Sequence, residues 1–337
     1  MDARAASGSL QLLIAGSTEV TNSTLDAVHV GWIGTGRMGF QLAKRLAIAG
    51  YDVAVCNRTR AKAEPLTQYG ATVVNKPDDL ADRDVVFTSV PADGDLLAVT
   101  VEEGGVLAAP ATTPKVLVDC STVSTGISAQ VRESAERRGC DFLAAPVSGN
   151  PKVAAAGGLT LAVSGPSDAF RRTEPLLHAL GRGVTYVGED EIARLVKLCH
   201  NVFLGVVMQS LVEVTLLAQK GGTTRAAFLD FLNNSVVGSA FTRYKTPALV
   251  SLDFSPTFTM ALMRKDFDIA LDAARELEVP MQTAAQVASL VSAAIGAGHR
   301  DEDFAALLVE QARGAGMVLE PEDVRVDDGQ SAAESSA

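Results

Sequence analysis

Residues 28–39 read VHVGWIGTGRMG, a short β-branched and aromatic run followed by three glycines in the spacing Gly-x-Gly-x-x-Gly. The run Val28–Ile33 predicts a strand, and the apolar spacing within Arg37–Ala49 predicts a helix after it. In that setting Gly34 permits a tight turn, Gly36 lets the backbone approach a pyrophosphate, and Gly39 allows close packing of helix on strand. The helix N-terminus offers unpaired N–H groups to phosphates. The stretch therefore predicts a dinucleotide site formed by Gly34, Thr35, Gly36, Arg37, Met38 and Gly39.

Strand-like runs alternate with helical patterns through the first half of the chain. The expected elements are strands over Val53–Cys56, Val85–Val90 and Val116–Asp119, a charged helix from Ala61, a helix over Ile127–Arg138, and later strands over Leu159–Ser164 and Thr185–Val187. The last two strands are expected as antiparallel-type additions. Strands that alternate with helices predict parallel βαβ units, and so an α/β fold with a doubly wound, Rossmann-type sheet.

Beyond about Asp190 the strand-like runs disappear and long helical segments follow, expected over residues 191–219, 224–233, 265–278, 283–297 and 303–314. The first is apolar on nearly every face from Leu198 to Leu217, which is typical of a helix buried between two bodies. We therefore predict a Rossmann domain over residues 28–190 and an all-α domain over 191–320. The Ala- and Ser-rich segments 1–27 and 321–337 are expected as a loose leader and a disordered tail.

The composition is that of a soluble globular protein, with 47% hydrophobic and 20% charged residues and a formal net charge of −11. Such acidity argues against a nucleic-acid or anionic-membrane surface. The four cysteines form no CxxC pair, so neither a metal site nor a disulfide framework is indicated. No stretch is expected to reach the length of a membrane span, with Leu198–Val212 nearest. We expect a cytoplasmic protein.

The second predicted strand ends in Cys56-Asn57-Arg58-Thr59, at the position where NAD-type sites place a carboxylate for the ribose hydroxyls. Here Asn57 carries no charge, and the guanidinium of Arg58 suits a 2′-phosphate. The segment Asn57–Thr59 therefore favours NADP over NAD as the cofactor. The alternative is a solvated loop arginine.

Polar residues follow the later strands. Ser121 and Thr122 could hold a carboxylate, a hydroxyl or the nicotinamide end of a cofactor, although hydroxyls at such junctions often only cap a helix. Val90 and Pro91, which end the preceding strand, are assigned to the same cofactor edge. Ser148 and Gly149 lie in a turn that can form an anion nest, although taken alone it is an ordinary loop.

Lys197 and Asn201 are four residues apart on the long apolar helix, hence on one face. Burial of an ammonium is costly, and desolvation lowers its pKa toward the range useful for proton transfer. We predict Lys197 as a general acid/base and Asn201 as its partner or a partner of the substrate. The alternative is a lysine that snorkels from the start of the helix. His200 is expected as a structurally satisfied residue rather than as the base.

Five segments in this order resemble the β-hydroxyacid dehydrogenase family: GTGRMG (34–39), DCSTVS (119–124), APVSG (145–149), KLCHN (197–201) and RKDFDIAL (264–271). That family includes 3-hydroxyisobutyrate dehydrogenases, tartronate semialdehyde reductases and glyoxylate/succinic semialdehyde reductases, and is related to 6-phosphogluconate dehydrogenases. The resemblance covers roughly residues 28–320.

The resemblance implies a catalytic role for Lys197 and assigns the substrate and the nicotinamide to its neighbours. The residues implied to bind substrate are Thr122, Ser148, Gly149, Asn150, Asn201, Phe258 and Asp266, with Thr122 near the nicotinamide and Lys265 closing over the cofactor. Relatives are commonly dimers, so a homodimer is expected. Arg264-Lys265-Asp266 is expected to open a helix.

Two departures from the family pattern bear on the substrate. The family usually reads Ser-Gly-Gly after Pro-Val, but here Asn150 and Pro151 follow Gly149. His200 precedes Asn201 as it does in 6-phosphogluconate dehydrogenases, whereas the semialdehyde reductases usually carry asparagine there. The sequence therefore predicts an NADP-dependent oxidoreductase that interconverts a small hydroxy acid or alcohol with its aldehyde or ketone. One alternative is an imine reductase or a reductase of bulkier carbonyls, although imine reductases usually place Asp or Tyr where Lys197 stands. Another is an idle NADP-binding scaffold or sensor.

Overall fold

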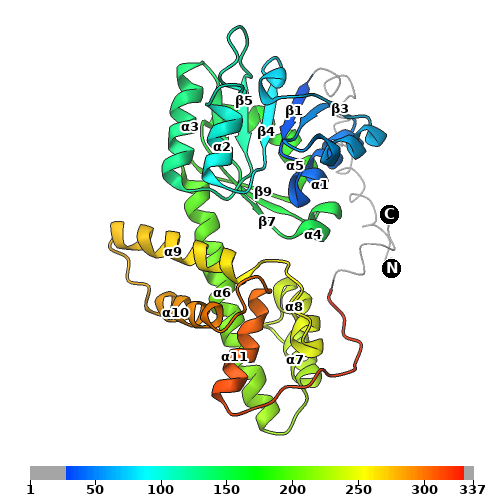
Figure 1. Cartoon of the computed structure of the whole chain (residues 1–337), viewed down its shortest axis with the longest axis vertical. Helices are drawn as coiled ribbons and strands as arrows, with labels where there is room; N and C mark the ends of the chain where they lie inside the picture. Colours follow the sequence, from blue (N-terminus) through cyan, green and yellow to red (C-terminus); the bar gives the residue numbers. More distant parts are fainter. Residues whose placement is uncertain (1–27, 330–337) are drawn as a thin grey trace, which may run out of the picture.

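The computed structural model describes residues 28–329, so the expected leader and residues 330–337 lie outside the described part. A sheet-containing body and a helical body are joined by the long helix α6 (Ile192–Lys220), which runs from the edge of the sheet through the helical body (Figure 1). The fold class expected from the sequence, a Rossmann-type sheet followed by an all-α region, is confirmed.

The described strands form one sheet in the order β3-β2-β1-β4-β5-β6-β8-β7, with β9 paired to β8. They are β1 (His29–Ile33), β2 (Asp52–Cys56), β3 (Thr72–Val73), β4 (Val85–Thr88), β5 (Val116–Asp119), β6 (Asp141–Ala144), β7 (Val147–Ser148), β8 (Thr160–Ser164) and β9 (Gly183–Gly188). The pairs from β3 through β6 are parallel, whereas β6 and β7 both pair antiparallel to β8. The late strands are thus antiparallel additions, as expected, with β9 parallel to β8.

Helices cover both faces of the sheet (Figure 1). On one face α1 (Arg37–Ile48) and α5 (Ser167–Leu180) bury Leu42 and Leu177 in a core with Trp32. On the other face α2 (Asp93–Thr100) and α3 (Thr125–Arg137) pack against the sheet. This two-sided covering is why the parallel strands are apolar at nearly every position.

The charged helix expected from Ala61 is wrong. The chain forms two 3-10 helices instead, η2 (Arg60–Lys62) and η3 (Glu64–Tyr69). Pro65 stands in the first turn of η3 and has no N–H to continue an α-helical ladder from the preceding residues. Gly70, in the left-handed region at φ +91°, ends the segment.

The helical body contains α7 (Arg225–Asn234), α8 (Ala240–Ser251), α9 (Met260–Glu276), α10 (Gln282–Gly296) and α11 (Leu307–Gly314) around α6. The expectation that a helix opens at Arg264 is wrong. The N-cap of α9 is Thr259, whose hydroxyl accepts from the Leu262 N–H, so Lys265 and Asp266 lie in the second turn.

Helix α6 agrees with the expected helix over residues 191–219 to within one residue. The expectation that no stretch reaches the length of a membrane span is wrong, because the 29 residues of α6 are long and apolar enough to cross a membrane by length and composition alone. About half of its most apolar window is buried inside the protein. Arg194, Asn201 and Gln209 are polar and buried on it, with partners on β5, α9 and α11 respectively. The helix is therefore the shared core element of the two bodies.

The segment after residue 320 differs from the expected disorder as far as residue 329. The buried Arg225 guanidinium donates to the carbonyl of Glu320 at 2.6 Å and to that of Val250 at 3.0 Å. The Glu322 carboxylate accepts from the N–H groups of Arg225 and Ala226, the start of α7. Glu320 and Glu322 thus bind the segment to α7 through Arg225 and Ala226, which the Ser- and Ala-rich composition did not indicate.

Candidate active site

The site lies where the carboxyl ends of the parallel strands meet α6 and α9. Gly34 adopts φ +94°, and a Cβ there would lie 2.2 Å from the carbonyl oxygen of Ser89. A Cβ on Gly39 would lie 2.0 Å from the carbonyl oxygen of Gly34, so helix and loop touch. Gly36 faces open space, with nothing within 4 Å of its Cβ position. The loop thus fits the close approach of a pyrophosphate to Gly36 at the start of α1.

The rest of the predicted cofactor loop is divided between core and surface. Met38 packs against the hydrophobic core beside α1. Arg37 is exposed, and no hydrogen bond or ion pair of its side chain occurs among residues 28–329. The Val90 side chain lies beside Gly34, and Pro91 after it is exposed. Arg37 is therefore a cation available to a phosphate group.

Asn57 has a structural task that the sequence did not indicate. Its side-chain oxygen accepts from the Thr35 N–H at 2.9 Å, and its amide donates to the Thr59 carbonyl at 2.9 Å. The first bond joins the end of β2 to the glycine loop, and the second lies within the turn after Asn57. Arg58 is 87% exposed and pairs with Asp95 at 3.1 Å. An exposed pair of this kind is weak and can be exchanged for a phosphate partner.

A buried polar network joins β4, β5 and α6. The Asp119 carboxylate accepts from the hydroxyls of Thr88 and Ser121, each at 2.6 Å, and from the Arg194 guanidinium at 2.5 Å. Ser121 in turn accepts from the Val90 N–H at 2.9 Å. Asp119 and Arg194 are at most 2% exposed. Neither residue was predicted from the sequence, although an arginine within an apolar helix is a signal of the same kind as Lys197.

Thr122 is not the cap of the following helix. Ser124 caps α3, with its hydroxyl accepting from the Ile127 N–H, and Ser121 belongs to the Asp119 network. The Lys265 ammonium of α9 donates to the Thr122 carbonyl at 3.4 Å. This contact brings α9 to the end of β5.

Lys197 lies one turn after Arg194 on α6 and is half-buried. Burial lowers the pKa of its ammonium from the usual 10.5 to about 8, and the nearby Asp266 carboxylate opposes this shift only in part. Within the described residues the ammonium has no hydrogen-bond acceptor and no ion-pair partner. A lysine in this state can both give and take a proton near neutral pH.

One turn further, four side chains form a continuous chain of hydrogen bonds. The Ser148 hydroxyl lies 2.9 Å from His200 Nε2, and His200 Nδ1 lies 3.0 Å from the Asn201 side-chain oxygen. The Asn201 amide donates to the Asp266 carboxylate at 2.6 Å. His200 is thus satisfied on both ring nitrogens. Its pKa is lowered by burial and by the charge of Lys197, while the bond to Asn201 raises it.

Asp266 is 1% exposed, and its second oxygen, Oδ1, is buried without a hydrogen-bond partner among residues 28–329. Lys265 Nζ lies 3.6 Å from that oxygen. A buried carboxylate oxygen without a hydrogen bond is costly, so Oδ1 can accept a hydrogen bond from a bound molecule. The structure thus brings Thr122, Ser148, Asn201, Lys265 and Asp266 to the surroundings of Lys197.

Phe258 and Asn150 serve local structure. Phe258 packs edge-on against Phe304, and its N–H donates to Asp303, which forms a buried 2.5 Å ion pair with Lys245. Asn150 caps the short helix α4 (Pro151–Ala155), where its side-chain oxygen accepts from the Val153 N–H. The side-chain oxygen of Asn150 therefore already accepts a hydrogen bond within the protein.

Gly149 adopts φ +133°, and a Cβ there would lie 2.5 Å from Leu159, so this turn requires glycine. The turn holds the backbone of Ser148 and Gly149 at the antiparallel end of the sheet, next to α6 through the Ser148–His200 contact.

The Lys245–Asp303 ion pair, whose carboxylate accepts from the Phe258 N–H, was not predicted from the sequence.

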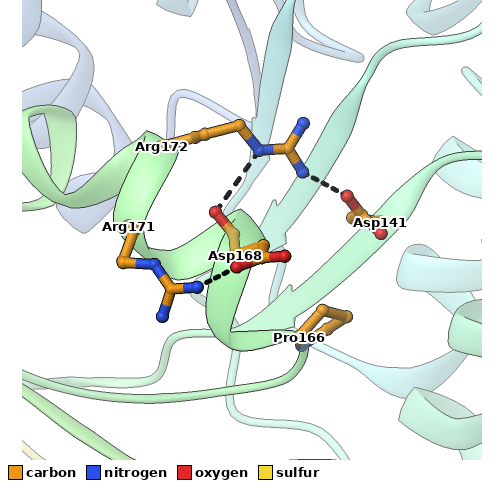
Figure 2. Close-up of a pocket in the computed structure, with 5 residues that line it drawn as sticks. All are labelled: Asp141, Pro166, Asp168, Arg171 and Arg172. Carbon is orange, nitrogen blue, oxygen red and sulfur yellow. Dashed lines mark hydrogen bonds and ion pairs between the residues drawn. The ribbon is translucent and has the colours of Figure 1, made fainter.

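A separate hollow is lined by Asp141, Pro166, Asp168, Arg171 and Arg172 (Figure 2). Asp141 begins β6, so the hollow lies at the amino edge of that strand, away from the glycine loop. Arg171 pairs with Asp168 and Arg172 pairs with Asp141. Each of the two arginines is paired with a carboxylate, so nothing in this hollow points to an anionic ligand.

The chain matches known NAD(P)-binding proteins over most of the described residues. A family model described as the NAD binding domain of 6-phosphogluconate dehydrogenase matches residues 29–188. A second, described as the NAD-binding of NADP-dependent 3-hydroxyisobutyrate dehydrogenase, matches residues 193–310. The 2-(hydroxymethyl)glutarate dehydrogenase of Eubacterium barkeri is 31% identical over 284 residues, which is 84% of this chain and 94% of that protein.

Two further relatives extend the comparison. Glyoxylate/succinic semialdehyde reductase 2 of Arabidopsis thaliana, a chloroplastic protein, is 29% identical over 87% of this chain and 82% of its own. The structure of Mycobacterium tuberculosis 3-hydroxyisobutyrate dehydrogenase with L-serine superimposes with a TM-score of 0.72 at 28% identity, over 84% of this chain and 99% of that one.

The protein thus belongs to the class of NAD(P)-binding oxidoreductases that act on CH–OH groups, with a Rossmann-type domain before a helical one. Within that class, the chain is a member of the β-hydroxyacid dehydrogenase family.

Proposed function

We propose that this enzyme uses NADP(H) to interconvert a small hydroxy acid or alcohol and its aldehyde or ketone, with Lys197 as the general acid/base. The observation that carries the proposal is the state of Lys197, a half-buried ammonium with a pKa near 8 and no partner within residues 28–329. Its neighbours on α6 and α9 are polar and held in place.

The cofactor, when bound at the glycine loop, supplies or accepts the hydride. In reduction the Lys197 ammonium donates a proton to the carbonyl oxygen as hydride reaches the carbonyl carbon. In oxidation neutral Lys197 takes the hydroxyl proton as hydride leaves the same carbon. Arg194, fixed by Asp119, orients the turn of α6 that carries Lys197. Asn201 and Asp266 hold the next turn, while Lys265 approaches from α9.

We expect the two directions to depend on pH in opposite ways. The lowered pKa of Lys197, about 8, means that the protonated acid is lost as pH rises through that value. For reduction, kcat/KM should be level below pH 8 and fall above it. For oxidation it should rise toward pH 8 and then level off.

Initial rates over a panel of small semialdehydes, keto acids and their alcohols, with the change in NADPH absorbance as the readout, measure these profiles. A cyclic imine in the panel tests the rival imine-reductase function. A break near the ordinary lysine pKa of 10.5 would contradict the desolvation of Lys197, and no turnover of any member would favour the idle scaffold.

The choice of NADP is supported by the charges around the β2 loop. Asn57 contributes no carboxylate, and Arg58 is exposed with a single weak partner, Asp95. Arg37, at the start of α1, is exposed beside the glycine loop. The two cations can approach a 2′-phosphate, whereas a ribose hydroxyl finds no acidic acceptor at Asn57.

Arg58→Ala is expected to raise the Kd of NADPH about tenfold, since one charge-assisted contact to the 2′-phosphate is lost, and to leave the Kd of NADH unchanged. Calorimetric titration of each cofactor measures both values. Arg60→Ala, two residues away and paired with Glu64, is the matched control and should change neither. If the wild type binds NADH more tightly than NADPH, NADP is the wrong cofactor.

The assembly is proposed to be a cytoplasmic homodimer. One face of α6 exposes large apolar side chains in helical spacing, with Phe203 65% and Leu217 74% exposed and Val214 between them. Phe231 of α7 is 73% exposed in the same helical body. Such side chains are typical of a protein interface. Light scattering should give twice the 35.1 kDa chain mass.

A further inference from the structure

The glycines that shape the cofactor loop also leave its backbone free to turn. Gly34 adopts φ +94°, a conformation that glycine takes readily, and glycine has many other conformations open to it. The N–H groups of Gly36 and Arg37, which suit a pyrophosphate, have no acceptor among residues 28–329. Their direction depends on the peptide unit before them, which joins Gly34 to Thr35. The loop therefore needs contacts that hold this peptide in one orientation.

Two side chains hold that peptide, one at each end. The Trp32 indole N–H donates to the Gly34 carbonyl at 3.0 Å. The Asn57 side-chain oxygen accepts from the Thr35 N–H at 2.9 Å. A trans peptide is planar, and its C=O and N–H point in opposite directions. Two hydrogen bonds on opposite sides of one plane therefore keep the plane from turning.

Trp32 is the single tryptophan of the chain and is fully buried on β1. Its ring stacks on Phe87 of β4, with ring centroids 5.2 Å apart and an angle of 13° between the planes. The same core contains Leu42 of α1. A Cβ on Gly39 would lie 3.0 Å from the indole nitrogen, so α1 closes over this contact. The packing thus fixes the indole, which can only donate, against the Gly34 carbonyl.

We propose that Trp32 and Asn57 are positioning residues that clamp the Gly34–Thr35 peptide and keep the loop in the shape that receives the pyrophosphate. The clamp acts on the part that NAD and NADP share, whereas Arg58 is proposed for the 2′-phosphate. The inference rests on the NAD(P)-binding domain and not on the choice between the two cofactors. Because an ordered loop loses less conformational entropy on binding, the clamp raises the affinity for both cofactors by the same factor.

The first test is Trp32→Phe, which keeps an aromatic ring against Phe87 and removes the indole donor. The Kd values of NADPH, NADH and ADP-ribose should rise by one common factor of about threefold to tenfold, the net worth of a neutral hydrogen bond. Calorimetric titration measures the three values. ADP-ribose contains the pyrophosphate but no nicotinamide, so an equal rise there assigns the effect to the pyrophosphate loop.

Phe87→Leu is the matched control, because it removes the stacked ring and leaves the indole hydrogen bond in place. Thermal unfolding should show a loss of stability in both variants, while Phe87→Leu keeps the three Kd values of the wild type. The proposal would be overturned by unchanged Kd values in Trp32→Phe or by a rise confined to NADPH. An equal rise in Phe87→Leu would also overturn it, since a general loosening of the core would then explain the effect.

Asn57→Ala removes the other end of the clamp, and it decides the question if Trp32→Phe does not fold. It should raise the three Kd values by a similar common factor, whereas Arg58→Ala is expected to affect NADPH alone. Since either loss frees the same plane, Trp32→Phe/Asn57→Ala should raise each Kd by less than the product of the two single factors. A rise equal to the full product would show two separate local effects and contradict a shared clamp.

Discussion

Lys197→Ala is expected to lower kcat by about two to four orders of magnitude, the usual worth of a positioned proton donor. No other lysine on α6 can replace it, because Lys220 lies at the far end of the helix and donates to the Ala315 carbonyl. Water reaching the cavity of the lost side chain is a weaker acid at pH 7. Cofactor affinity should stay nearly unchanged, since Lys197 is not part of the glycine loop.

Steady-state rates at saturating NADPH, together with the Kd of NADPH, measure both outcomes. Lys220→Ala is the matched control and should retain wild-type kcat. Near-wild-type turnover by a folded Lys197→Ala protein would remove the acid/base assignment. A large rise in the Kd of NADPH would instead place Lys197 in cofactor binding.

Asp119→Ala should lower the free energy of unfolding by about 3–5 kcal/mol, because it removes the 2.5 Å partner of the buried Arg194 charge and leaves only Glu191, at 3.3 Å, to pair with it. Asp119 also receives the hydroxyls of Thr88 and Ser121, so the loops at the ends of β4 and β5 lose their common acceptor. The kcat should fall as well, because Arg194 precedes Lys197 by one turn of α6.

Urea unfolding of the single variant and of Asp119→Ala/Arg194→Leu measures the effect. The double variant should recover part of the lost stability, since it removes the buried charge that has lost its shorter ion pair. Arg58→Ala breaks an exposed pair and should cost less than about 1 kcal/mol, which makes it the control. A loss that is equally small for Asp119→Ala would mean that water or another group compensates Arg194.

The sheet could be predicted because its strands are locally encoded. The apolar runs of β1, β2 and β5 are bounded by turn residues, and Gly34–Gly39 follows the first of them directly. Helix α5 was missed because Pro175 and a run of charged residues interrupt its periodicity, and α8 because Pro247 stands inside it. Packing overrides these local signals.

The sequence predicted the residues around Lys197 one segment at a time. It did not predict the hydrogen bonds that join them. The chain of bonds through His200 and Asn201 joins β7, α6 and α9, and no spacing along the sequence shows that Ser148 meets His200. The same holds for the Lys245–Asp303 pair, whose partners are 58 residues apart. Such pairs depend on the tertiary arrangement.

Helix α6 limits how this enzyme can be recombined with its relatives. Arg194 bonds to Asp119 of β5 and Asn201 bonds to Asp266 of α9, and Lys197 lies between them on one uninterrupted helix, so the two partners together fix the rotation of the turn that carries Lys197. One inserted or deleted residue turns everything beyond it by about 100°, because an α-helix has 3.6 residues per turn. A chimera joined within these turns must keep the residue count intact, whereas one joined before Ile192 must also carry Asp119 with its arginine.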